Sequence, residues 1–80
     1  MKLLVVEDEW RSAARLERGL IESGYTVDLA ADAVTALSLA RTRPYDALLL
    51  DLGLPGRDGW SVLESLREAG DKTPVLCLTA

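Results

Sequence analysis

Short apolar runs, separated by longer segments of helical period, constrain the fold of this chain more than any other feature. Three segments built on such runs span Leu3–Val6, Asp46–Asp51 and Pro74–Leu78. Continuous apolar runs of this length are typical of strands that are covered on both faces, as strands of parallel sheets are. A fourth strand is predicted over Tyr25–Ala30, where apolar and polar residues alternate as in a half-covered edge strand.

Three helices are predicted between these strands. The first begins at Trp10, ends at Gly24 and carries an apolar stripe of Trp10, Ala13, Leu16, Leu20 and Ile21. The second begins after Asp32, which can cap its first turn, and ends before Pro44. The third follows a loop over residues 53–59 and ends at Gly70. Because each helix is long enough to cross between parallel strands, the order predicts a doubly wound α/β sheet.

The composition narrows the possible partners and location. The 80 residues suffice for one domain at most, and 49% of them are apolar, so we expect a folded globule with one core. The net charge of −4 disfavours nucleic acid as a direct ligand, because phosphate backbones bind clustered Lys and Arg. No run is long enough for a signal peptide or a membrane span, so no membrane association is expected. Cys77 is the single cysteine, which fits a reducing cytoplasm.

Acidic residues follow two of the buried strands. Glu7, Asp8 and Glu9 come directly after one, and Asp51 ends another. Parallel strands end at the same edge of a sheet, so these carboxylates should converge where α/β sheets bind ligands. Their mutual repulsion would be relieved by a hard cation such as Mg²⁺. For Glu7 and Asp8 a solvated acidic helix start is an equally good interpretation, whereas packing gives no reason for Asp51.

Three small residues could complete such a site. Gly53 allows the backbone to come close, so its carbonyl could face a metal, although a plain loop glycine explains it equally well. Thr79 follows the last strand at the same edge, and its hydroxyl could donate to a phosphoryl oxygen. The alternative for Thr79 is a β-branched residue that ends a strand. Ala80 is small and leaves room for a group on Asp51.

Taken together, these segments resemble the receiver domain of bacterial two-component response regulators. The resemblance rests on LLVVEDE (residues 3–9), YDALLLDLGLPGRDG (45–59) and TPVLCLTA (73–80), and it is greatest with the subfamily whose receivers precede a winged-helix DNA-binding domain. It implies a flavodoxin-like sheet of strand order 2-1-3-4. It also implies transcription control through a DNA-binding effector domain that these residues do not contain.

The resemblance implies a role for each site residue. Asp51 is expected to accept a phosphoryl group from the phosphohistidine of a partner sensor histidine kinase. Asp8 and Asp51 are expected to bind Mg²⁺ directly, with Glu7 acting largely through water and the Gly53 carbonyl completing the set. Thr79 is expected to bind the phosphoryl group. The chain is then a signalling phosphoacceptor with self-catalysed phosphotransfer and dephosphorylation, and no enzyme acting on other substrates.

The sequence departs from the family pattern after the fourth predicted strand. Receivers continue through a helix, a fifth strand and a final helix, so we expect residues 1–80 to form the N-terminal portion of a receiver. The family's phosphate-binding lysine cannot be assigned to Lys2 or Lys72. The apolar edge at Pro74–Leu78 is expected to favour homo-oligomers or domain swapping.

A second class of function stays open at this point. The chain could be an inactive interaction or folding fragment that associates through this edge, and modification of Asp51 distinguishes the two classes. A metabolite phosphatase is disfavoured because Gly53 stands where an aspartyl phosphatase has its second Asp. A flavodoxin-like cofactor binder is disfavoured because the acidic Glu7–Glu9 segment would repel its phosphate.

Overall fold

All four strands in the described part of the chain run parallel in one sheet. The computed structural model describes residues 1–51 and 59–78. The elements along the chain are β1 Lys2–Val6, α1 Trp10–Glu22, β2 Thr26–Ala30, α2 Ala33–Thr42, β3 Ala47–Asp51, α3 Gly59–Glu68 and β4 Val75–Leu78. The strand order is β2-β1-β3-β4, which confirms the predicted order and the doubly wound α/β class.

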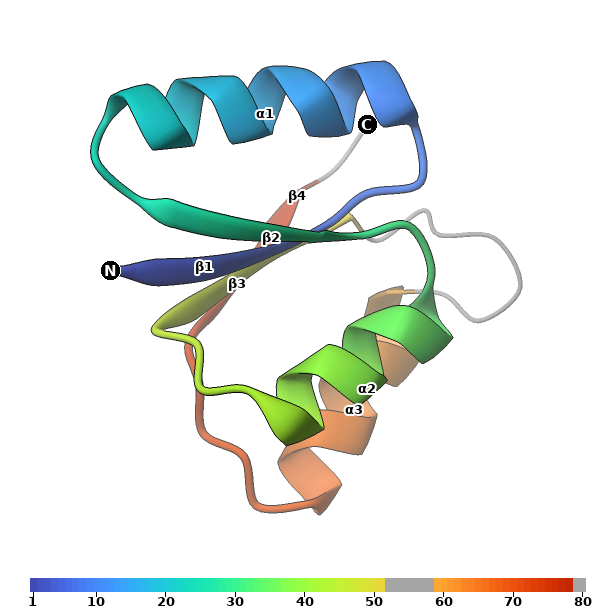
Figure 1. Cartoon of the computed structure of the whole chain (residues 1–80). Helices are drawn as coiled ribbons and strands as arrows, with labels where there is room; N and C mark the ends of the chain where they lie inside the picture. Colours follow the sequence, from blue (N-terminus) through green and yellow to red (C-terminus); the bar gives the residue numbers. More distant parts are fainter. Residues whose placement is uncertain (52–58, 79–80) are drawn as a thin grey trace.

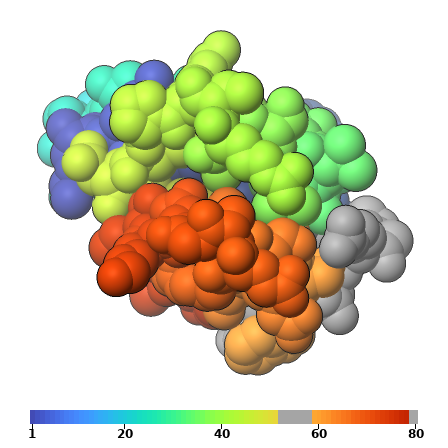
Figure 2. Space-filling view, turned by 90° about the horizontal axis from the view of Figure 1, so that it is seen from below, coloured from blue at the N-terminus to red at the C-terminus, as the bar shows by residue number. Residues whose placement is uncertain are grey.

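Helices cover both faces of the sheet. Figure 1 shows α1 on one face and α2 and α3 on the other, and Figure 2 shows α2 and α3 side by side. The core on the α2 and α3 face consists of Leu4, Val6, Ala30, Ala33, Ala36, Leu37, Leu48, Leu50, Val62 and Leu66. Strand β1 is buried on both faces, as its apolar run predicts. Strand β3 is buried on the α2 and α3 face but only half-buried on the other, and no residue of β4 is buried, so the apolar runs overstate how much of these two strands is covered. None of the helices in residues 1–51 and 59–78 has the length and apolarity to span a membrane.

Helix α1 packs on the sheet through a narrower stripe than the sequence predicts. Ala13 is buried, and Leu16 and Leu20 are half-buried. Trp10 and Ile21, which were predicted on the same stripe, are 71% and 53% exposed. At ~100° of rotation per residue, these two side chains point roughly 90° away from the direction that the other three share. Helix α1 therefore contacts the sheet through the middle of the predicted apolar stripe, and the residues at its margin stay exposed to solvent.

Both predicted glycine stops end helices as expected. Gly24 and Gly70 have φ values of 94° and 81°, in the region that favours glycine. After α1, the Gly24 N–H donates to the Ile21 carbonyl at 2.9 Å and the Tyr25 N–H donates to the Leu20 carbonyl at 3.0 Å. These two bonds form a Schellman motif, which satisfies carbonyls that the helix leaves open.

The starts of α2 and α3 differ in how well the sequence predicts them. Asp32 caps α2 as predicted, because its side chain accepts a hydrogen bond from the Thr35 N–H at 2.7 Å. Gly59 was predicted as the last loop residue, but it is the buried first residue of α3. The rest of the predicted loop, residues 52–58, lies outside the described residues.

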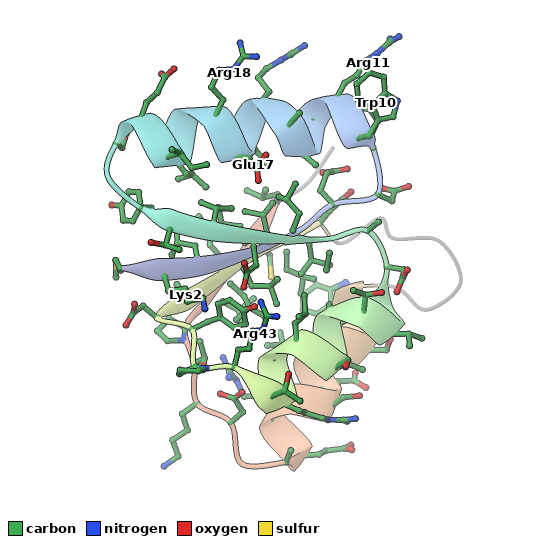
Figure 3. The ribbon with its side chains drawn as sticks, viewed as in Figure 1. Lys2, Trp10, Arg11, Glu17, Arg18 and Arg43 are labelled. Carbon is green, nitrogen blue, oxygen red and sulfur yellow. The ribbon has the colours of Figure 1, made fainter. Side chains whose placement is uncertain are left out.

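Asp28 in β2 belongs to a polar network. Its Oδ2 accepts hydrogen bonds from the Tyr45 hydroxyl at 2.6 Å and the Arg43 guanidinium at 3.1 Å. The Lys2 Nζ lies 3.9 Å from the same oxygen, and the Asp28 side chain is 25% exposed. These groups lower the pKa of Asp28, with the Tyr45 hydrogen bond as the largest cause. Figure 3 shows the side chains of Lys2 and Arg43 on the side of the sheet that α2 and α3 cover.

Candidate metal centre

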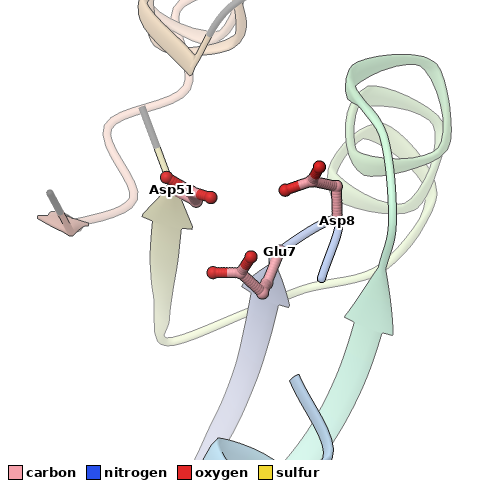
Figure 4. A group of neighbouring side chains, drawn as sticks. All are labelled: Glu7, Asp8 and Asp51. Atoms are coloured by element: carbon pink, nitrogen blue, oxygen red, sulfur yellow. The ribbon is translucent and has the colours of Figure 1, made fainter. Parts of the chain in front are cut away.

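Glu7 and Asp51 follow neighbouring parallel strands at the same edge of the sheet. Strand β1 ends at Val6, which pairs with Leu50 of β3. The next residues, Glu7 and Asp51, therefore emerge side by side. Asp8 follows Glu7, and Figure 4 shows that the three carboxylates lie close together above the ends of the two strands. This arrangement confirms the predicted convergence of these three residues.

The separations of the three carboxylates suit one shared cation. Each side chain offers an oxygen within 4.8 Å of the oxygens of the other two. Because Mg²⁺ holds oxygen at about 2.0–2.1 Å, two oxygens on one ion lie at most ~4.2 Å apart. Small side-chain rotations, or one water between a carboxylate and the ion, account for the difference between 4.8 Å and this limit. Glu7 and Asp51 are half-buried and Asp8 is exposed, so the ion would keep part of its water shell.

The electrostatics of Glu7 show the cost of holding these acids together. The pKa of Glu7 is raised, first by burial and then by the negative charges of Asp51 and Asp8. The Glu9 N–H opposes this by donating to Glu7 Oε1 at 3.0 Å. A positive ion among the three oxygens would reverse the balance, because it favours the ionised form of every carboxylate. The residues present therefore fit Mg²⁺ chemically as well as geometrically.

Glu9 is separated from this cluster, although the sequence placed it with Glu7 and Asp8. Its side chain caps α1 by accepting a hydrogen bond from the Ser12 N–H at 2.7 Å. That bond is the main reason why the pKa of Glu9 is lowered. A carboxylate three residues before this N–H, at a helix start, is the local pattern that could have identified the cap.

The remaining predicted site residues cannot be placed. Gly53, Thr79 and Ala80 lie outside the described residues, so their roles stay predictions. Within residues 1–51 and 59–78, the group that could hold a metal consists of Glu7, Asp8 and Asp51. The site thus joins the ends of the two central strands, next to the buried Val6 and Leu50.

Comparison with known proteins identifies the family. Residues 3–80 match the family described as the response regulator receiver domain. The chain belongs to this family. Receiver domains are signalling modules. In open α/β sheets, ligands bind at the carboxyl ends of the strands, and the carboxylate cluster of this receiver lies at that edge.

Curated relatives of this receiver are transcriptional regulators. The transcriptional activator protein IrlR of Burkholderia pseudomallei is 51% identical over 80 residues, which are 100% of this chain and 34% of that protein. The transcriptional regulatory protein CusR of Escherichia coli K12 is 45% identical over 80 residues, or 35% of its length. The chain therefore spans about a third of the length of these relatives.

Solved structures share the fold closely. The receiver domain of the Francisella response regulator 1452 matches with a TM-score of 0.95 and 35% identity, over 99% of this chain and 65% of that one. The response regulator TrrA of Thermotoga maritima, solved in complex with Mg²⁺-BeF, matches with a TM-score of 0.94 and 33% identity, over 99% of this chain and 69% of that one.

Proposed function

We propose that this receiver accepts a phosphoryl group on Asp51 with Mg²⁺ as cofactor. The observation that supports this most directly is the approach of the Glu7, Asp8 and Asp51 oxygens to within 4.8 Å of one another. Three like charges at the end of two packed strands are unfavourable unless a cation joins them. Such a site suits the transfer of an anionic group to a carboxylate.

The chemistry follows from the position of each side chain. An Asp51 oxygen attacks phosphorus, and the P–N bond of a phosphohistidine breaks with its electron pair moving to the imidazole nitrogen. The product is an acyl phosphate on Asp51. Asp8 and Glu7 would hold the cofactor beside it, with Glu7 acting largely through water. Mg²⁺, when bound, supplies positive charge that offsets the charge of the transferring oxygens.

The residues outside the described ranges are given roles by their motifs. We assign the Gly53 carbonyl to the metal and the Thr79 hydroxyl to the phosphoryl group. We assign to Ala80, as a small residue, the role of leaving space for the phosphoryl group on Asp51. These assignments rest on the resemblance of residues 45–59 and 73–80 to receiver motifs.

The phosphodonor and the output are proposed from the relatives. We propose a sensor histidine kinase as the donor, and transcription control through a DNA-binding domain outside these residues, since the relatives are transcriptional regulators about three times as long. The single cysteine, Cys77, is consistent with a cytoplasmic location.

Intact-mass spectrometry tests the proposal. The chain is incubated with a small-molecule phosphodonor such as acetyl phosphate, with Mg²⁺ or with EDTA. We expect a gain of one phosphoryl group that needs Mg²⁺ and is lost in Asp51→Asn. The matched control is Asp46→Asn, an exposed carboxylate that accepts the Lys2 N–H at 2.7 Å just before the same strand begins.

The second candidate function is an interaction module whose acidic cluster is not modified. It is favoured by the outcome in which wild type and Asp51→Asn both stay unmodified while circular dichroism shows both folded. Modification of Asp51→Asn to the wild-type extent would instead place the phosphoryl group elsewhere and contradict the proposed acceptor.

A further inference from the structure

Three hydrogen bonds of Glu9 link the candidate metal centre to the start of helix α1. The Glu9 side chain accepts the Ser12 N–H at 2.7 Å, and the Glu9 carbonyl accepts the Ala13 N–H at 3.0 Å. The Glu9 N–H donates to Glu7 Oε1 at 3.0 Å. The residue that caps α1 is therefore also the residue whose backbone holds a carboxylate of the metal centre.

The two bonds into α1 fix the conformation of Glu9. They hold it at φ −85° and ψ 110°, the extended conformation that is typical of an N-cap residue. The angle φ sets the direction of the N–H relative to the helix that follows, so the cap also sets where this N–H points. The first N–H groups of a helix have no partner within the helix. Loss of the capping oxygen should therefore loosen the first turn and, with it, the donor to Glu7.

Glu7 is held at its backbone and again at its carboxylate. The Glu7 N–H donates to the Ala30 carbonyl at 3.0 Å, at the end of β2. This bond fixes the backbone but leaves the side-chain torsions of Glu7 free to rotate. The bond from the Glu9 N–H restrains the carboxylate at the far end of those torsions. A carboxylate that is already restrained loses less conformational freedom when an ion binds.

We propose that Glu9 is a positioning residue for the metal centre. By capping α1, it holds Glu7 in the orientation in which the three carboxylates of the centre can share one cation. This inference rests on the proposed function, because it needs Mg²⁺ at these carboxylates. Groups that orient a metal ligand without touching the metal typically change the affinity by about 10–100-fold. Because Glu7 acts largely through water, we expect loss of the cap to weaken Mg²⁺ binding by roughly tenfold, the lower end of this range.

A competing explanation is that Glu9 attracts the cation through its charge alone. Serine distinguishes the two explanations, because it is a strongly preferred N-cap residue and carries no charge. Glu9→Ser keeps a capping oxygen and removes the charge, whereas Glu9→Ala removes both. Positioning through the cap therefore predicts that serine preserves Mg²⁺ binding and alanine does not.

Asp32 provides a matched control in the same chain. It caps α2 as Glu9 caps α1, with a carboxylate oxygen that accepts the N–H three residues later at 2.7 Å. Among residues 1–51 and 59–78, Asp32 is not part of the group that could hold a metal. Asp32→Ala thus removes a cap and a negative charge outside the metal centre, and it shows what the loss of a cap does through the fold alone.

Titration with MgCl₂ at constant ionic strength, followed by amide NMR, measures the Kd of each variant. We expect Glu9→Ala to bind Mg²⁺ roughly tenfold more weakly than wild type, and Glu9→Ser and Asp32→Ala to stay within about twofold of wild type. Hydrogen exchange of the residue 9 amide without metal reports on the bond to Glu7 itself. This exchange should be faster in Glu9→Ala than in wild type and Glu9→Ser, and unchanged in Asp32→Ala.

Three outcomes would overturn the role of Glu9 and leave the metal site standing. One is Mg²⁺ binding by Glu9→Ala as tight as by wild type. Another is binding by Glu9→Ser as weak as by Glu9→Ala, which would assign the effect to charge. The third is equal weakening by Asp32→Ala, which would assign it to a general loss of stability. A wild-type chain that binds no Mg²⁺ would instead contradict the proposed function, and this role of Glu9 with it.

Discussion

Glu7 and Asp51 lie side by side at the ends of the two central strands, with carboxylate oxygens within 4.8 Å of each other. Burial of Glu7 and the negative charges of Asp51 and Asp8 together raise the pKa of Glu7. The sheet therefore holds two acids close together at the position where the proposed function needs a nucleophile and a metal. The first two predictions follow from this pair.

Replacing Glu7 by glutamine should stabilise the metal-free chain at neutral pH. The raised pKa means that the native state binds more protons than the unfolded state from about pH 4.5 upward, until the folded-state pKa is passed. Stability from Glu7 is thus lost as pH rises through this window. Glu7→Gln removes the loss, and keeps an oxygen for the Glu9 N–H. We expect a gain of up to about 1 kcal/mol, because solvent screens the site.

Thermal unfolding in EDTA at pH 5 and pH 7.5 checks this. The Tm of Glu7→Gln should exceed that of wild type clearly at pH 7.5 and much less at pH 5. Asp46→Asn serves as the control for loss of a negative charge. Equal effects at both pH values would show that the benefit of Glu7→Gln has nothing to do with the charge of Glu7.

Magnesium should stabilise the chain through the same carboxylates. A ligand at ten times its Kd stabilises the native state by about 1.4 kcal/mol. For a domain of this size that corresponds to a rise in Tm of roughly 5–10 °C. Asp8→Asn and Asp51→Asn should each abolish the rise, while Asp46→Asn keeps it. The measurement compares MgCl₂ with NaCl at equal ionic strength, and a rise in both salts would argue against a specific site.

The fold was predictable because its determinants are local. Apolar runs mark the strands, and Gly24 and Gly70 mark two helix ends by their positive φ. The site was predictable in part, because parallel strands bring Glu7 and Asp51 to one edge. The cap formed by Glu9 was missed, since three consecutive acids look alike until the direction of each side chain is known.

Other features depend on contacts that no local pattern encodes. Asp28 is bonded to Arg43 and Tyr45, which are 15 and 17 residues away along the chain. This network is therefore visible only in the folded structure. The exposure of Trp10 and Ile21 depends on how much of α1 the sheet can reach. The periodicity of apolar residues shows which face of a helix is apolar, but it does not show how wide a part of that face the sheet covers.

The Tyr45 hydroxyl should contribute measurably to stability. It donates to Asp28 at 2.6 Å, and Tyr45→Phe removes that bond at a cost of about 1 kcal/mol. The bond also lowers the pKa of Asp28, so the stability it provides is present above about pH 4 and is lost as pH falls toward the lowered pKa. Tyr45→Phe should therefore lose less stability than wild type between pH 5 and pH 3.

Chemical denaturation at several pH values measures this difference. Tyr25→Phe is the matched control, because within the described residues its hydroxyl has no hydrogen-bond partner. It should behave as wild type. If both tyrosine variants lost the same stability at every pH, the bond to Asp28 would not be the cause.

Two glycines in and after α1 should respond in opposite ways to alanine. A Cβ at Gly19 or at Gly24 meets no atom within 4 Å, so crowding does not distinguish them. Gly19 lies inside α1, where alanine is favoured by about 0.5–1 kcal/mol. Gly24 has φ 94°, where an L side chain costs roughly 1–2 kcal/mol. Gly19→Ala should therefore raise the midpoint of urea unfolding and Gly24→Ala should lower it. Stabilisation by both would mean that Gly24 relaxes to a negative φ and that the Schellman motif does not fix the end of α1.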